Sequence, residues 1–263
     1  MKFGFVLTFI FILAGAVQAA SLPCVGTYKV AVNESEPLYF RDGNAQRFIG
    51  ASQDVLNELA VRTGCRFSVA SLNRTRLISE LKSFRIDLIV VTIKNPVFDE
   101  LAGFIPMESI QREALVTVES GSKYKTVADL IKDPQIHFLI LPALSVFFTK
   151  EESVKLRKEG RFITATSIQN SYEILRRTTQ TAVVQGDWVN SYYINTMNLT
   201  GNYLRVLDPS KAFEVGIYYR SNIDNQKDLN AIKQALGNMV SDGTWKKITE
   251  RYGNFKTKKP TRK

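Results

Sequence analysis

A chain of 263 residues, 44% of them hydrophobic, has enough apolar material for one large or two smaller domains, which excludes disorder throughout. The net charge of +10 does not by itself predict nucleic-acid binding, because five basic residues are concentrated in the last eight positions. We expect residues 256–263 to form a disordered basic tail, with contact to anionic lipid or polymer as the alternative.

The N-terminus has the pattern of a secretory signal peptide. One positive charge at Lys2 precedes an apolar run over 3–17, and small residues follow at Ala19 and Ala20. We therefore expect residues 1–20 to be removed and the mature chain to be exported. No later stretch of the sequence is long and apolar enough to predict a membrane-spanning helix.

The chain has two cysteines, Cys24 and Cys65. In an exported protein an even number of cysteines favours a disulfide. Each cysteine comes just before a predicted strand, and neighbouring parallel strands would bring their starts side by side. We expect a Cys24–Cys65 disulfide, with two unpaired thiols as the alternative.

The first half of the mature chain predicts a β-α-β-α-β unit with a parallel sheet. We expect strands over 28–32, 66–70 and 86–94, helices over 52–63 and 75–84, and a loop over 33–50. The third strand is apolar on both faces, which is typical of a central strand covered by helices. Asn95-Pro96 ends it, so Thr92 and Lys94 are expected where parallel sheets bind ligands. The alternative is a core strand followed by an ordinary surface turn.

The second half predicts another α/β unit of similar size. We expect strands over 113–118, 136–141, 161–165 and 181–185, and helices over 125–131, 145–159, 168–177 and 188–197. Strands over 203–207 and 214–219 and helices over 229–240 and 244–252 close the chain. Two such units favour two lobes, and a cleft between domains is a favoured site for a small ligand.

Four segments carry a resemblance to a known family. They are Gly50 to Gly64, Leu77 to Leu81 with Arg85-Ile86-Asp87, Phe213 to Arg220, and Leu229 to Leu236 followed by 241–248 and Tyr252-Gly253. In this order they resemble the family 3 extracellular solute-binding proteins, the periplasmic components of polar amino-acid ABC transporters. The paired cysteines and Arg74-x-Arg76 are similar to a less characterised branch of that family.

The resemblance implies an α/β, two-lobed, periplasmic-binding-protein-like (type II) fold. Each lobe would be a mostly parallel sheet flanked by helices, lobe 1 comprising 22–115 plus 213–255 and lobe 2 comprising 116–212, with two hinge strands between them. It also implies a periplasmic monomer without a cofactor, which captures a small polar ligand in the cleft and delivers it to an ABC permease. An extracytoplasmic ligand sensor and a dehydratase or lyase on the same scaffold are the alternatives.

The resemblance also implies site residues in lobe 1. Tyr39 or Phe40 matches the aromatic residue that stacks on the ligand, with a core aromatic as the alternative. Thr92 keeps its place at the strand end, where a plain strand residue is the alternative. The arginine that grips a ligand carboxylate in the family falls at Phe98 here, and this departure leaves the ligand class open.

The remaining candidates are mainly charged. Lys94 supplies a cation without the bidentate geometry of a guanidinium, and Arg76 is either a ligand contact or a solvated helix-end charge. Ser145 opens a predicted helix whose N-terminus favours an anion, with simple capping as the alternative. The acidic residue of the family falls one place before Asp187, so Asp187 and, more weakly, Gln185 are candidates, and a helix cap is the alternative for Asp187.

Catalytic residues are not expected. His137, the single histidine, lies in an apolar predicted strand, where we expect a core residue, and no nucleophile elbow is visible. The spacing of His, Cys, Asp and Glu predicts no metal site. An enzyme would need a cleft carboxylate, for which Glu34, Glu36 or Asp187 would have to serve.

Overall fold

The computed structural model describes residues 24–43, 47–72, 74–117, 124–141, 145–199 and 203–254. The expected signal peptide over 1–20 and the basic tail over 256–263 lie outside these residues. None of the helices in the described part of the chain combines the length and the apolar character needed to cross a membrane.

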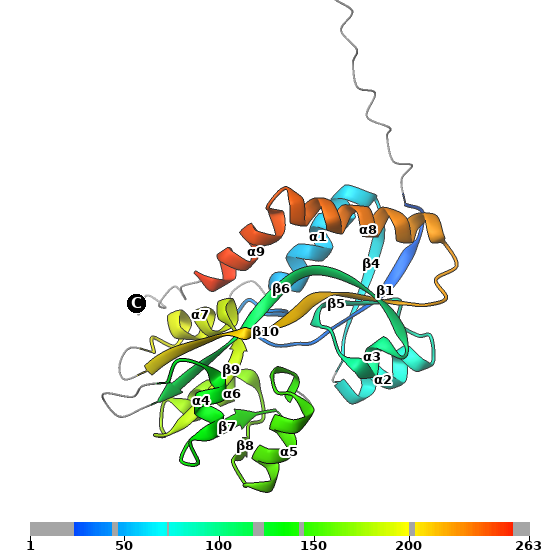
Figure 1. The fold of residues 1–263 in the computed structure, drawn as a ribbon. Helices are drawn as coiled ribbons and strands as arrows, with labels where there is room; N and C mark the ends of the chain where they lie inside the picture. The colour runs from blue at the N-terminus through cyan, green and yellow to red at the C-terminus, as the bar shows by residue number, and fades with distance from the viewer. Residues whose placement is uncertain are drawn as a thin grey trace, which may run out of the picture.

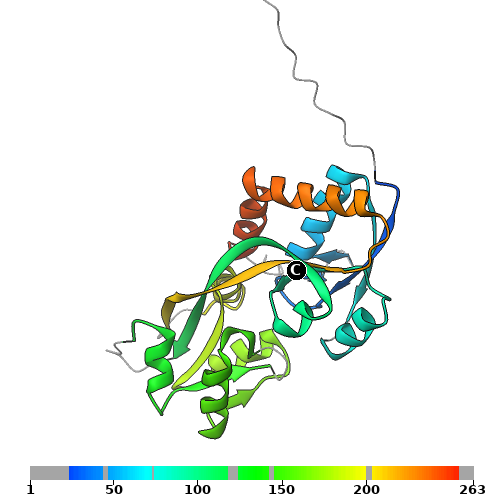
Figure 2. The same cartoon turned by 45° about the vertical axis from the view of Figure 1, so that its right-hand side comes forward.

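One eight-stranded sheet runs through the molecule in the order β4-β1-β5-β10-β6-β9-β7-β8. Its strands are β1 (Thr27–Val32), β4 (Arg66–Ser71), β5 (Leu88–Ile93), β6 (Ala102–Thr117), β7 (His137–Ile140), β8 (Phe162–Thr164), β9 (Thr181–Gly186) and β10 (Tyr203–Arg220). Helices flank the sheet in two groups, and β6 and β10 pass from one group to the other (Figures 1 and 2). The predicted two-lobed α/β fold with two connecting strands is confirmed.

The first group forms around three parallel strands, β4, β1 and β5. The first four residues of β5 are buried, as its apolar sequence predicts. Helix α1 (Ala51–Thr63) ends at Gly64, which adopts a φ of 75° that favours glycine. Helix α2 (Arg74–Lys82) leads into β5. The predicted loop over 33–50 contains a short hairpin of β2 (Phe40–Arg41) and β3 (Phe48–Ile49).

The second group forms around β8, β7 and β9, which are also parallel. Its helices are α4 (Val127–Lys132), α5 (Lys150–Lys158), α6 (Ile168–Leu175) and α7 (Asp187–Thr196). The prediction of one helix over 145–159 is wrong, because a 3₁₀ turn, η1 (Ser145–Phe147), precedes α5. Thr149 and Glu152 form a capping box, in which each side chain accepts a hydrogen bond from the other residue's amide, and this starts a new helix.

The strands β6 and β10 are longer than the sequence predicts. Strand β6 has 16 residues and begins well before the predicted strand over 113–118. Strand β10 has 18 residues and joins the two predicted strands over 203–207 and 214–219. They pair antiparallel along their whole length, with register shifts between Asp208 and Ala212 and between Val215 and Gly216. Backbone hydrogen bonds between β6 and β10 therefore keep each strand extended through polar segments that the sequence alone does not predict as strand. The lobe boundaries themselves remain a prediction.

Helices α8 (Gln226–Ser241) and α9 (Thr244–Gly253) return to the first group and pack on α1. Helix α7 also contacts α9, so the second group of helices touches the first. The predicted disulfide is confirmed: Cys24 and Cys65 are bonded, with Cα atoms 4.7 Å apart. They are adjacent because β1 and β4 pair in parallel, with Thr27 opposite Arg66.

Candidate functional site

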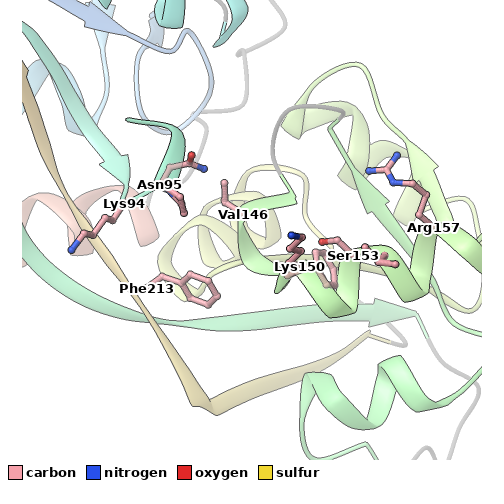
Figure 3. Close-up of a pocket in the computed structure, with 10 residues that line it drawn as sticks. Lys94, Asn95, Val146, Lys150, Ser153, Arg157 and Phe213 are labelled. Carbon is pink, nitrogen blue, oxygen red and sulfur yellow. The ribbon is translucent and has the colours of Figure 1, made fainter. Parts of the chain in front are cut away.

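A cavity of about 500 Å³ lies between the end of β5 and helix α5 (Figure 3). It is lined by Lys94, Asn95, Pro96, Val146, Phe148, Lys150, Ser153, Val154, Arg157 and Phe213. Its volume is within the range of small-ligand pockets, roughly 300–1,000 Å³. Elements of both lobes and of a connecting strand therefore meet at one cavity.

A bulge in β5 sets the direction of the strand end. Tyr218 of β10 lies opposite Ile89, and Gly216 lies opposite Thr92, so two residues of β5 face one residue of β10. Val91, within this bulge, has a φ of 50°, which is a strained conformation for a β-branched residue. A bulge bends the strand and re-aims the side chains beyond it. The orientation of the strand end toward the cavity follows from this local irregularity.

Beyond the bulge, Lys94 and Asn95 form one wall of the cavity. The Lys94 ammonium lies 2.9 Å from the Glu214 carboxylate and 5.6 Å from the centre of the Phe104 ring. The hydrogen bond to Glu214 raises the pKa of Lys94, so this side chain stays protonated. In Figure 3 it points away from the residues of α5. The Asn95 side chain accepts a hydrogen bond from the Val97 amide and thereby starts the short helix α3 (Pro96–Asp99).

Helix α5 forms the opposite wall. Lys150, Ser153, Val154 and Arg157 are spaced at i, i+3, i+4 and i+7, which places them on one face of the helix. All four line the cavity. The Arg157 guanidinium lies over the Phe162 ring, 5.9 Å from its centre, within cation–π distance. This interaction favours a position of the side chain near β8.

The other side of α5 is anchored by a buried arginine on β6. Arg112, whose side chain is 1% exposed, donates two hydrogen bonds to Glu152 of α5 and two to Asp208 of β10. A fifth bond, of 2.8 Å, reaches the Phe147 carbonyl in η1. The Arg112 guanidinium therefore links β6 and β10 to η1 and α5, which carry residues of the cavity lining. Such a fork can make parallel bonds to a carboxylate, which a lysine cannot.

The carboxylates of this cluster are held in their charged forms. Burial alone raises the pKa of Glu152, but hydrogen bonds from Arg112 and Lys211 lower it to about 2. The pKa of Asp208 is also lowered, because hydrogen bonds from Ser210 and Arg112 outweigh the effect of burial. The anchor is thus an ionic cluster at neutral pH, and α5 is positioned by charge as well as by packing.

Apolar side chains form the remaining surface of the cavity. Phe148 is buried in an aromatic cluster, with its ring 5.3 Å from that of Phe138 and 5.5 Å from that of Phe162. Phe213 of β10 is half-buried and packs edge-on against Phe147 at 5.4 Å. The cavity therefore offers both cationic and aromatic contacts.

One group of side chains in the described part of the chain has the spacing of a metal site. It comprises Cys24, Cys65 and Asp228. The two sulfur atoms are joined in the disulfide, so neither is available as a thiolate ligand. Asp228 instead accepts hydrogen bonds from the Gly26 amide and the Tyr28 hydroxyl. This cluster is a structural junction between β1 and α8.

Comparison with known proteins decides the family. Residues 28–255 match the bacterial extracellular solute-binding proteins, family 3. The chain is a family 3 solute-binding protein. No curated protein sequence matches it at a significant level.

Several solved structures are similar in fold to this solute-binding protein. An ancestral arginine-binding protein bound to arginine has 20% identity and a TM-score of 0.68, covering 86% of this chain and 98% of that one. The ancestral amino acid-binding protein AncCDT-1, a precursor of cyclohexadienyl dehydratase, has 20% identity and a TM-score of 0.65, with coverage of 86% and 95%. The Pleurobrachia bachei iGluR3 LBD in complex with glycine has 14% identity and a TM-score of 0.70, with coverage of 89% and 98%. At these identities the likeness establishes the fold alone.

Both aromatic candidates of this solute-binding protein are buried away from the cavity. Tyr39 is 6% exposed and stacks on Phe48, with ring centres 4.5 Å apart. Phe40 is 8% exposed and packs edge-on against Tyr192 and Tyr252. Neither lines the cavity, and their role as ligand contacts stays a prediction.

The predicted polar residues are dispersed. Lys94 lines the cavity, Thr92 lies two residues before it, opposite Gly216, and the exposed Arg76 pairs with Glu80 at 3.6 Å. The backbone of Ser145 opens η1, but its side chain lies outside the described part of the structure.

Gln185 and Asp187 lie at the end of β9 and the start of α7. Gln185 is opposite Glu113 of β6, and the Asp187 carboxylate accepts a hydrogen bond of 2.8 Å from the Trp188 amide. Burial raises the pKa of Glu108, which accepts a hydrogen bond from Trp245, and the nearby charge of Asp187 raises it further. Asp187 is the first residue of α7, whose N-cap is Gly186, and its role in binding stays a prediction.

Phe98, where the family has an arginine, is buried in the core. Phe98 is 3% exposed, and its ring packs edge-on against Tyr218 at 5.3 Å, so this position faces the core. His137 was expected in the core, but it is only half-buried. It is the first residue of β7, and its Nδ1 lies 3.1 Å from the Gln135 carbonyl oxygen. The residues of α5 were missed as candidates, although their i, i+3, i+4, i+7 spacing could have identified a shared face.

Proposed function

We propose that this family 3 solute-binding protein captures a small polar ligand, an amino acid or a related compound, between its lobes and delivers it to an ABC permease. The observation that carries the proposal is the cavity lined by the segment after β5, by α5 and by β10, because elements of both lobes contribute to it. Movement of the lobes about β6 and β10 would then enclose the ligand, as in hinge closure. Of the predicted ligand-binding residues, Lys94 is the one that we place at this cavity.

The similar structures support an amino-acid-like ligand. They include an arginine-binding protein bound to arginine and an LBD in complex with glycine. The family consists of extracellular proteins, and the disulfide is consistent with an oxidising compartment. We propose a periplasmic location, reached through the signal peptide, and a monomeric state.

A thermal-shift screen of the mature protein against amino acids, amines, organic acids and sugars tests the binding function. A ligand at a hundred times its Kd adds about 2.7 kcal/mol to the free energy of unfolding. For a chain of this size that is about 5–10 °C in Tm. Small-angle scattering with and without the hit tests closure, and a folded protein that no compound stabilises contradicts the proposal.

Two alternatives are separated by further measurements. An enzyme on this scaffold is favoured by the likeness to a precursor of cyclohexadienyl dehydratase, and it would convert the bound compound to product. A ligand sensor is favoured by the likeness to an iGluR3 LBD, and it would leave uptake of the ligand unchanged when the gene is deleted. Loss of uptake without turnover of the ligand supports transport.

A further inference from the structure

The charge of the cavity lining is one-sided. Lys94, Lys150 and Arg157 are cationic, and none of the lining residues is acidic. A cavity with walls of one sign attracts ligands of the opposite charge. The chemistry of the lining therefore favours an anion over a cation.

The three cations are not equivalent. Lys94 is 2.9 Å from Glu214 and so has its charge matched by the protein. By contrast, neither Lys150 nor Arg157 lies within ion-pair distance of an acidic side chain in the described parts of the chain, although Lys150 interacts electrostatically with the adjacent Glu151. Stacking of Arg157 near the Phe162 ring leaves the N–H groups in the guanidinium plane able to donate to a ligand. The unmatched charge of the cavity therefore belongs to α5.

The spacing on α5 suits a single anionic group. Lys150 and Arg157 are seven residues apart, about 10 Å along the helix axis at 1.5 Å per residue. Ser153 lies between them, about one turn from each, and supplies a hydroxyl donor on the same face. Two long side chains can converge over that hydroxyl, whereas the Lys94 ammonium on the opposite wall points away from α5.

The helix is also well supported as a binding surface. Its N-terminal turn is fixed by the Thr149–Glu152 capping box and by the bonds from Arg112 to Glu152. A ligand-binding face on a helix that is anchored by its other side holds its geometry better than a loop does. Val146 and Phe213 border this face and would contact an apolar part of the ligand.

We infer that the ligand is an organic anion with an apolar portion, and that Lys150, Ser153 and Arg157 of α5 supply its anion-binding contacts. The inference rests on the proposed binding function and adds the ligand class and the residues of lobe 2 that recognise it. Because both unmatched cations belong to one lobe, the ligand docks on α5 before the lobes close over it.

The test measures binding to the full mature protein by calorimetry. The anionic probes are L-glutamate, succinate, benzoate and phenylpyruvate, and the control probes are putrescine, spermidine and glucose. At least one anion binds, and its affinity falls as NaCl is raised, because ionic contacts that are open to solvent are screened. Lys150→Gln and Arg157→Gln each weaken that affinity about tenfold to a hundredfold, the range for a charge-assisted hydrogen bond.

Lys158→Gln is the matched control, since it removes the same charge from the same helix at a residue outside the cavity lining. It leaves the affinity within twofold of the wild-type value. A cation or glucose as the preferred probe would leave the proposed binding function intact and overturn this inference. Equal affinities for Lys150→Gln, Arg157→Gln and wild type would also overturn it. A folded protein that binds none of the probes overturns this inference as well, whereas the proposed binding function fails only if the thermal-shift screen also finds no ligand.

Discussion

Replacing Arg112 by alanine removes five hydrogen bonds from a position that is fully buried. Asp208, which is also fully buried, then keeps its negative charge without its cation, while Glu152 retains the Lys211 ammonium and the Thr149 amide. Removing one partner of a buried ion pair typically costs about 3–5 kcal/mol, because the other charge is left uncompensated. At about 2–4 °C of Tm per kcal/mol for a chain of this size, we expect Tm to fall by about 6–20 °C.

Urea unfolding followed by circular dichroism measures the loss in free energy of unfolding, and a thermal melt measures the fall in Tm. The exposed Arg251, whose guanidinium pairs with Asp54 at 2.7 Å, provides the matched control. Arg251→Ala should cost less than about 1 kcal/mol, because surface ion pairs contribute little. An Arg112→Ala variant no less stable than Arg251→Ala would refute the argument that this cluster anchors α5.

A double substitution tests the physical cause. If the uncompensated charge is responsible, Arg112→Ala combined with Asp208→Asn should recover part of the lost stability, since the neutral amide is less costly to bury. If the double variant is less stable than Arg112→Ala alone, the loss arises from missing packing instead. Ligand binding should weaken in Arg112→Ala as well, because α5 loses its support.

Three further predictions concern the disulfide, the core position 98 and the response to acid. Cys24→Ser with Cys65→Ser should lower the free energy of unfolding by about 2–5 kcal/mol, and equal urea midpoints of the oxidised and reduced wild type would contradict this. Phe98→Arg should lower the free energy of unfolding by more than about 2 kcal/mol, because it buries a charge, and it should bind no amino acid more tightly than wild type. Thermal unfolding and calorimetry measure the two effects, and a variant with unchanged Tm and tighter binding would contradict this prediction. The pKa of Glu152 is about 2 when folded, below its unfolded value, so its stabilisation is present above about pH 4.3 and is lost as pH falls toward 2. The stability difference between wild type and Arg112→Ala should therefore shrink from pH 5 to pH 2.5 in urea titrations, and a constant difference would exclude this linkage.

The candidate site could be predicted only where it depends on local sequence. Lys94 was identified because an apolar strand, a polar end and Asn95-Pro96 follow one another directly in the chain. Lys150 and Arg157 share a face by helical periodicity, but which face turns toward the cavity depends on Arg112, some 40 residues away in sequence. The burial of Phe98 likewise depends on Tyr218, which belongs to a strand from the end of the chain.

The sequence by itself determined most helices and strands, the cysteine pairing and the family, because periodicity, caps and turn residues act over a few positions. Only the tertiary structure decided that β6 and β10 are continuous, since each is completed by pairing with the other across a large sequence separation. It also decided where α5 begins and which of its residues face β5. Those features arise from hydrogen bonds and ion pairs between distant segments, and these form only when the chain is folded.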